Sequence, residues 1–248
     1  MKQEEKLQKN WTEGSARYSG IVEGELNSFK RQAWTDLILS NAGTQEKMKI
    51  LDIGTGPGFF AILMSLQGHQ VTAVDCTEAM LEAAKQNAFQ YGVDAEFLLS
   101  DAQELPFEDE RFDLVISRNV AWTIIDAEKA YKEWKRVLKP GGRVLIFDAN
   151  WNIRLFDEEK QKQYEQDLAE VQKRYPAYEI LYHTEEELNF RRGMPMCSRV
   201  RPQWDFDVLL RLGYRNIFCD TDLRERIYTP EEALLNRSTP MFLLRAEK

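Results

Sequence analysis

Residues 50–60 read ILDIGTGPGFF, and this stretch decides the fold. An apolar run passes directly into a glycine-rich turn and then into a second apolar run, which is typical of a buried strand followed by a helix. In an open α/β sheet, ligands lie beyond the carboxyl ends of the strands and contact the first strand-to-helix turn. The stretch therefore predicts a ligand site after the first strand, although glycines also serve tight turns that bind nothing.

The sequence around this stretch alternates between strand-like and helix-like segments. Short apolar runs bounded by Gly, Pro or Asp predict buried parallel strands at 48–53, 70–74, 95–99, 113–117 and 143–148. Between them, Thr77 is predicted to cap a helix over 78–91, and Asp126 to cap a helix that ends near Leu138. Such repeats imply right-handed crossovers and a mostly parallel sheet covered on both faces, which is a doubly wound α/β fold.

The two ends of the chain depart from this alternation. Residues 11–42 read as helical, and residues 151–213 as polar and mostly helical, which predicts a cover and a lid. Two late apolar runs predict final strands at 216–220 and 241–245. We expect one domain over 1–248 with four parts: a helical cover at 1–45, a ligand-binding core at 46–150, a helical lid or substrate insertion at 151–213, and final strands at 214–248.

Composition excludes several classes of function. The formal net charge of −8 repels nucleic acid and anionic lipid surfaces. No apolar run approaches the roughly 18 residues needed to span a bilayer, and the first ten residues lack the apolar stretch of a secretory signal. Three widely spaced cysteines and two histidines predict neither a disulfide framework nor a His-rich metal centre. We expect a cytoplasmic protein with no nucleic acid, membrane or metal partner.

Two carboxylates follow the next two predicted strands. Asp75 ends the second strand, where it can accept hydrogen bonds from both hydroxyls of a ribose, and Asp101 follows the third, where it can accept from an adenine amino group. Each could instead be a solvated turn residue. Together with the glycine-rich turn, however, they place three compatible features at the ends of three successive strands, which predicts a nucleoside site.

The spacing of the glycines indicates which kind of nucleoside the turn binds. A dinucleotide fingerprint requires G-x-G-x-x-G, whereas this turn reads G-x-G-x-G and Phe59 stands at the third required glycine. Asp52 adds a negative charge beside the turn, which disfavours a pyrophosphate and can hold an ammonium group. A cationic nucleoside that carries an amino acid fits better than NAD, and an NAD-dependent oxidoreductase remains the alternative.

At this point residues 48–149 resemble the class I S-adenosylmethionine-dependent methyltransferases, in particular the small-molecule branch similar to the enzymes of ubiquinone and menaquinone biosynthesis. The resemblance rests on five motifs: LDIGTGPG at 51–58, VDCTEAML at 74–81, SDAQELPF at 100–107, FDLVISRN at 112–119 and VLKPGGR at 137–143. It implies a Rossmann-like methyltransferase fold with seven strands, the last antiparallel. It also implies S-adenosyl-L-methionine as cofactor and S-adenosyl-L-homocysteine as product.

The resemblance further implies which residues bind the cofactor. Its methionine part would contact the first strand and turn, its ribose the end of the second strand, and its adenine the residues that follow, while the end of the fourth strand closes the site. An aromatic residue near the amino terminus often covers the cofactor in this family. The residues so implied are Tyr18, Asp52, Gly54, Gly56, Asp75, Cys76, Met80, Asp101, Ala102, Ser117 and Arg118.

The acceptor side carries fewer signals. Methyl transfer from a sulfonium is an in-line displacement, so a general base is needed only if the acceptor must lose a proton. His183 could be such a base or a structural histidine. Asn119 and Trp122 follow the fourth strand and Trp151 the fifth, so they face the crevice and are further candidates, although large aromatics are commonly core residues.

A basic cluster lies within the predicted lid at Arg191, Arg192, Arg199 and Arg201. A carboxylate or phosphate on the acceptor would explain it. The alternative is internal pairing with the acidic run at 185–187, within one or two helical turns.

The sequence thus predicts methyl transfer from S-adenosylmethionine to a small-molecule acceptor. An NAD-dependent oxidoreductase and a non-catalytic S-adenosylmethionine-binding protein remain the alternatives. Trp11 and Tyr18 could belong to a dimer contact or to a lid, so a monomer and a homodimer are both compatible with the sequence.

Overall fold

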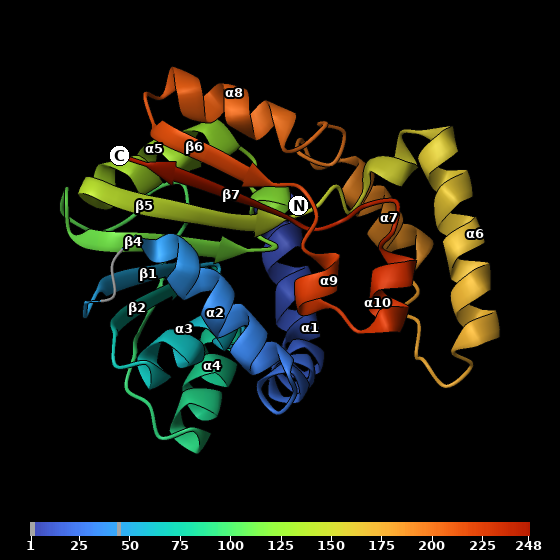
Figure 1. The fold of residues 1–248 in the computed structure, drawn as a ribbon, viewed down its shortest axis with the longest axis horizontal. Helices are drawn as coiled ribbons and strands as arrows, with labels where there is room; N and C mark the ends of the chain where they lie inside the picture. The colour runs from blue at the N-terminus through green and yellow to red at the C-terminus, as the bar shows by residue number, and fades with distance from the viewer. Residues whose placement is uncertain (1–2, 44–45) are drawn as a thin grey trace.

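The computed structural model describes residues 3–43 and 46–248. Its strands form one seven-stranded sheet in the order β3-β2-β1-β4-β5-β7-β6 (Figure 1). β1 to β5 run parallel, and β7 is antiparallel to both of its neighbours, as predicted. The strands are β1 Lys49–Ile53, β2 Gln70–Asp75, β3 Glu96–Leu99, β4 Phe112–Arg118, β5 Leu138–Asp148, β6 Arg215–Asp220 and β7 Phe242–Glu247.

Helices cover both faces of this sheet because successive strand residues point to opposite sides. Ile50 packs into the core on one face, with residues of α2, α3, α4 and α9, whereas Leu51 packs into the core on the other, with residues of α5 and α8. The predicted doubly wound α/β fold is therefore confirmed. The helices named here are α2 Lys30–Ala42, α3 Phe59–Leu66, α4 Glu78–Gln90, α5 Ala127–Val137, α8 Gln203–Arg211 and α9 Arg224–Ile227.

Of the two helix caps predicted from the sequence, one is present in the structure and the other is not. The Asp126 side chain accepts a hydrogen bond from the Lys129 N–H at 2.9 Å and begins α5, as predicted. Thr77 does precede α4, but its hydroxyl makes no capping bond, so that prediction was wrong. The Thr77 N–H instead donates to Asp75 Oδ1 at 3.0 Å, and its hydroxyl lies against Cys76 Sγ.

The fifth strand is longer than the sequence predicted. It begins at Leu138 rather than at Arg143, because Leu138 already pairs with Phe112 before an irregularity in the register. α5 consequently ends at Val137.

The amino-terminal cover consists of α1 Gln3–Leu26 and α2. α1 packs along α4, where Asn87 Nδ2 donates to Ser19 Oγ at 3.2 Å. Farther along α1, the Trp11 ring meets the Trp122 ring edge to face, with centroids 6.0 Å apart. The cover therefore contacts both α4 and the segment that follows β4.

The segment predicted as a lid, 151–213, is divided in two, and α10, which lies outside that segment, joins one of the parts. α6 Glu158–Arg174, α7 Glu185–Arg192 and α10 Pro230–Leu235 lie beyond the carboxyl ends of the parallel strands (Figure 1). α8, in contrast, packs on the sheet through Val208 and Leu209. The stretch 203–213 therefore belongs to the sheet-covering layer, because α8 has an apolar stripe that α6 and α7 lack. None of the helices within 3–43 and 46–248 is long and apolar enough to cross a bilayer.

Candidate active site

A cavity of about 880 Å³ opens at the carboxyl ends of the parallel strands. Ligand pockets for small molecules are commonly about 300–1,000 Å³, so this cavity can take a nucleoside together with a second small molecule. It is lined by all but one of the residues predicted for the site: Tyr18, Asp52, Gly54, Gly56, Asp75, Cys76, Met80, Asp101, Ala102, Arg118, Asn119, Trp122, Trp151 and His183. The exception is Ser117, which is buried and does not line the cavity.

Two glycines of the glycine-rich loop, Gly54 and Gly56, are required for different reasons. Gly54 and Gly56 both have positive φ, at 65° and 52°. A Cβ on Gly54 would lie 2.3 Å from Val120 Cγ2, so this glycine is required by packing. A Cβ on Gly56 would meet nothing within 4 Å, and Gly56 lines the cavity, so the space beside it is open for a ligand.

Asp75 ties the ends of β1 and β2 together. Its Oδ2 accepts from the Gly56 N–H at 2.9 Å, and its Oδ1 accepts from the Thr77 N–H at 3.0 Å. Burial raises the pKa of this carboxyl group, while those two backbone hydrogen bonds oppose the shift. The Thr77 hydroxyl and the Cys76 backbone also lower the pKa of this carboxyl group, so Asp75 is held by several groups of the two loops.

Asp52 lies beneath the loop and is almost fully buried. Its Oδ2 accepts from Thr55 Oγ1 at 2.6 Å and from the Ala61 N–H at 3.1 Å, while Oδ1 has no hydrogen bond within the described part of the chain. Burial raises the pKa of Asp52 to about 7, and the hydrogen bond from Thr55 acts against that rise. A cationic donor at Oδ1 would favour the ionised form.

The segment after β3 forms another part of the cavity wall. Asp101 Oδ1 accepts from the Gln103 N–H at 2.8 Å and from Gln103 Nε2 at 3.0 Å. Gln103 Oε1 in turn accepts from the Asp126 N–H at 2.8 Å. The exposed Asp101 carboxylate is thus held in place by a residue that sequence reasoning did not single out.

Arg118 lines the cavity within a cluster of balanced charge, which we call the buried tetrad: Glu25, Lys30, Arg118 and Glu232. The Arg118 guanidinium stacks over the Phe59 ring, 4.4 Å from its centroid, and its Nη2 donates to Glu25 Oε2 at 2.9 Å. Lys30 Nζ lies 2.6 Å from Glu232 Oε1 and 3.5 Å from Glu25 Oε1. Three of these residues were not predicted, because their positions in the sequence share no local pattern.

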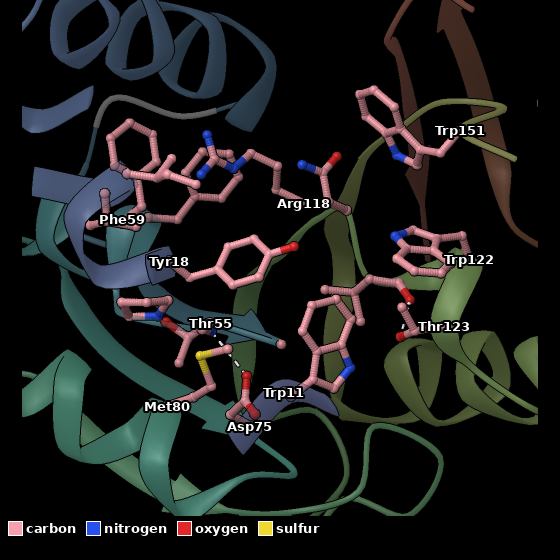
Figure 2. Close-up of a pocket in the computed structure, with 18 of the residues that line it drawn as sticks. Trp11, Tyr18, Thr55, Phe59, Asp75, Met80, Arg118, Trp122, Thr123 and Trp151 are labelled. Atoms are coloured by element: carbon pink, nitrogen blue, oxygen red, sulfur yellow. Dashed lines mark hydrogen bonds between the residues drawn. The ribbon is translucent and has the colours of Figure 1, made fainter. Parts of the chain in front are cut away.

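Aromatic side chains cross the cavity. Figure 2 shows the Tyr18 ring reaching from α1 into the cavity, with Thr55 and Met80 on one side and Trp122 and Trp151 on the other. The Trp11 ring packs edge to face against both Tyr18, at 5.5 Å between centroids, and Trp122. α1 therefore contributes two aromatic rings to the cavity wall, and a role for Tyr18 in covering the cofactor stays a prediction.

Asp148, at the end of β5, fixes the two tryptophans on the far side. Its Oδ1 accepts from Trp151 Nε1 at 2.8 Å, and its Oδ2 accepts from the Trp122 N–H at 3.3 Å. Asp148 is fully buried, and its charge is balanced by Arg201, which also pairs with Asp205. Arg201 is thus committed to a buried network.

The other arginines of the basic cluster have separate environments. Arg192 pairs with Glu185 at 2.9 Å, as the internal-pairing alternative predicted, and Arg199 is exposed outside the cavity. Arg191 lines the cavity instead, with its guanidinium 5.0 Å from the Trp122 ring centroid. The four arginines therefore do not act as one patch.

His183, which precedes α7, and Asn119, which follows β4, both line the cavity. His183 Nδ1 is buried without a hydrogen-bond partner in the described part, since Glu187 Oε2 is 3.7 Å away. Burial, together with the nearby Arg191, lowers the pKa of His183 to about 4, so its ring is neutral at pH 7. Asn119 has a positive φ of 60°, which asparagine tolerates better than most residues.

Comparison with known proteins finds relatives for the part of the chain that forms the first five strands and their loops. Residues 51–146 match the family described as methyltransferase domain. The uncharacterized methyltransferase YcgJ of Bacillus subtilis is 36% identical over 113 residues, 45% of this chain and 45% of that protein. The ubiquinone/menaquinone biosynthesis C-methyltransferase of Idiomarina loihiensis is 33% identical over 141 residues, 54% of this chain and 55% of that protein.

A solved structure extends the likeness in fold. Phosphoethanolamine N-methyltransferase 2 of Haemonchus contortus, in complex with S-adenosyl-L-methionine, superposes with a TM-score of 0.60 at 21% identity, covering 87% of this chain and 52% of that one. The matched region spans about half the length of the two curated relatives. Residues 51–146 are therefore similar to the methyltransferase domain family, and the chain shares the Rossmann-like fold of the solved methyltransferase structure.

Proposed function

We propose that this chain binds S-adenosyl-L-methionine in the cavity and transfers its methyl group to a small-molecule acceptor. The observation that carries the proposal is the convergence of Gly56, Asp75 and Asp101, from the ends of three adjacent strands, on one cavity. The family match over 51–146 and the methyltransferase relatives support it.

The cavity residues fit this cofactor in shape and in hydrogen-bonding capacity. Gly56 leaves open space where any other residue would place a Cβ. Asp75 presents its carboxylate to the ribose hydroxyls, and Asp52 Oδ1 can accept from an ammonium group. Asp101 offers a fixed carboxylate to the adenine amino group. In this proposal Cys76 and Met80 flank the adenine.

The bound cofactor supplies an electrophilic methyl group on a sulfonium, and the chain's own residues supply position and protection. Tyr18, Trp11 and Trp122 exclude water from the space beside the cofactor loop. Asp148 holds Trp122 and Trp151 in place, which fixes the wall against which an acceptor lies. His183 lines the cavity and is the candidate base for an acceptor hydroxyl or amine that must lose a proton.

The proposal extends to the surroundings of the reaction. A cytoplasmic location is part of the proposal, in keeping with the methyltransferase relatives. The acceptor is a small molecule, and a carboxylate or phosphate on it would suit the arginine side chains of the cavity.

The test is a turnover experiment. The purified chain is incubated with S-adenosylmethionine that carries an isotopically labelled methyl group and with a fractionated small-molecule extract, and labelled products are sought by mass spectrometry. We expect S-adenosylhomocysteine to accumulate together with one labelled product, and Asp75→Ala to reduce both at a cofactor concentration below saturation. Cofactor binding without labelled product in any fraction would indicate a non-catalytic binding protein.

A further inference from the structure

Apart from Asp52, Asp75 and Asp101 beside the glycine-rich loop, the charged side chains of the cavity form two groups, and only one of these two contains both acids and bases. The buried tetrad contains two acids and two bases within ion-pair distance of one another. The second group, which we call the insertion cations, comprises Arg154 and Arg191, with His183 beside them. An unbalanced group of cations inside a cavity requires an anion or pays an electrostatic cost.

Arg191 is the clearest member of this group. It is mostly shielded from solvent, and no carboxylate within the described ranges 3–43 and 46–248 lies within 4 Å of it. Its Nη1 donates to Asn152 Oδ1 at 3.1 Å, and its plane faces the Trp122 ring. Burial lowers the pKa of Arg191, and Arg154 adds to this effect. The guanidinium has further N–H donors for which the described chain supplies no acid.

Arg154 repeats this arrangement from another element. It lies in the short helical turn Ile153–Leu155 after β5, and its guanidinium stacks on the Tyr164 ring at 4.2 Å from the centroid. Its Nη1 donates to a neutral partner, Gln161 Oε1, at 3.0 Å. A guanidinium stacked on a ring keeps its N–H edge available for a carboxylate or phosphate.

Glu187 acts on Arg191 through its charge, but it forms no ion pair with Arg191 within 4 Å. Glu187 is engaged in the capping box of α7, where its Oε2 accepts from the Thr184 N–H at 2.7 Å and from Thr184 Oγ1 at 3.2 Å. It stands 3.7 Å from His183 Nδ1, beyond hydrogen-bond distance.

We propose that Arg154 and Arg191 bind a carboxylate or phosphate group of the methyl acceptor. This inference rests on the proposed function and names the acceptor class for the same site. Both arginines come from segments beyond the carboxyl ends of the strands, whereas the glycine-rich loop lies at the strand ends themselves. An anion held by the arginines directs the rest of the acceptor along Trp122 toward the cofactor loop.

The test compares an acid with its neutral counterpart on the full chain loaded with S-adenosylhomocysteine, so that no transfer occurs. Benzoate, phenyl phosphate and benzamide are titrated by NMR into the wild type and into Arg191→Gln, Arg154→Gln and Arg192→Gln. Arg192 is the matched control, because it neighbours Arg191 but pairs outside the cavity with Glu185. Arg191→Lys, which keeps the charge, guards against a variant that fails to fold.

We expect at least one of the two acids to bind the wild type more tightly than benzamide. Each glutamine variant in the cavity should lose about tenfold or more, the size of a lost charge-assisted interaction, whereas Arg192→Gln should be unchanged and Arg191→Lys should retain most of the affinity. The stronger of the two acids identifies the anion.

Three results would overturn the inference: benzamide binding as well as both acids, Arg191→Gln behaving like Arg192→Gln, or Arg191→Gln weakening S-adenosylhomocysteine instead of the acids. The last result would mean that the arginine holds the cofactor's own carboxylate. If the wild type binds no S-adenosylhomocysteine, the proposed function fails, and the same titrations on the ligand-free chain still test the anion site.

Discussion

The backbone N–H of Gly56 donates to Asp75 Oδ2 at 2.9 Å, so the glycine-rich loop after β1 and the carboxylate at the end of β2 form one hydrogen-bonded unit. The two groups expected to contact a nucleoside therefore hold each other in position. A change at either one should affect ligand binding more than it affects the fold.

Gly56→Ala should block the cofactor at a small cost in stability. A residue with a Cβ at positive φ loses about 1–2 kcal/mol of folding free energy, and the new methyl group projects into open space. Gly68→Ala is the matched control, because Gly68 also has positive φ and open space but does not line the cavity. Urea unfolding should show similar losses for the two variants, while only Gly56→Ala weakens S-adenosylhomocysteine binding. Equal binding by both would contradict the role of the loop.

Asp75→Ala should weaken S-adenosylhomocysteine binding by about 1.5–3 kcal/mol, the value of charge-assisted hydrogen bonds, which is roughly tenfold to a hundredfold. Isothermal titration gives the dissociation constant, and a thermal melt shows whether the variant is folded. Asp113→Ala serves as a control carboxylate on β4 that does not line the cavity. Affinity unchanged in a folded Asp75→Ala protein would exclude Asp75 as the ribose partner.

Arg201→Met should destabilise the fold by about 3–5 kcal/mol, because it leaves Asp148 and Asp205 buried without a counter-charge. The exposed pair of Arg192 and Glu185 is the comparison, since Arg192→Met should cost less than about 1 kcal/mol. The free energy of unfolding in urea measures both. Similar losses in the two variants would show that the Arg201 network does not anchor the end of β5.

His183 should make stability depend on pH. Its folded pKa of about 4 lies below the ordinary 6.5, so between these values the unfolded chain binds a proton that the folded chain does not. The free energy of unfolding should therefore fall as pH falls through this window. His183→Asn should lose less free energy of unfolding over the same pH window. Asp52 titrates in the opposite sense, but its effect cancels in the comparison because both proteins contain it. Parallel pH profiles would mean that His183 is protonated normally in the folded chain.

The sequence was most informative where local chemistry and topology coincide. The strand-turn-helix at 50–60, the acids that end β2 and follow β3, and the alternation of apolar runs were enough to predict the doubly wound sheet. Together with the family resemblance they also predicted part of the cavity wall. This succeeded because parallel strands bring their carboxyl ends to one edge, so residues distant in sequence share a site. Their roles toward a ligand remain predictions.

The remaining features depend on tertiary contacts that no local pattern encodes. Glu25, Lys30 and Glu232 meet Arg118 only because α1, α2 and α10 converge on the end of β4. Arg191 and Arg192 are neighbours in sequence, yet one faces the cavity and the other pairs with Glu185. The apolar residues of α8 stand among polar segments of the sequence, so α8 was assigned to the lid, whereas it packs on the sheet.

Calorimetric titration of the full chain with S-adenosylhomocysteine, S-adenosylmethionine and NAD in parallel, after removal of any co-purified ligand, tests the proposed cofactor most directly. We predict micromolar binding of the two sulfur nucleosides and no binding of NAD, because Phe59 stands where a dinucleotide site needs its third glycine. Binding of NAD alone would contradict the proposed function.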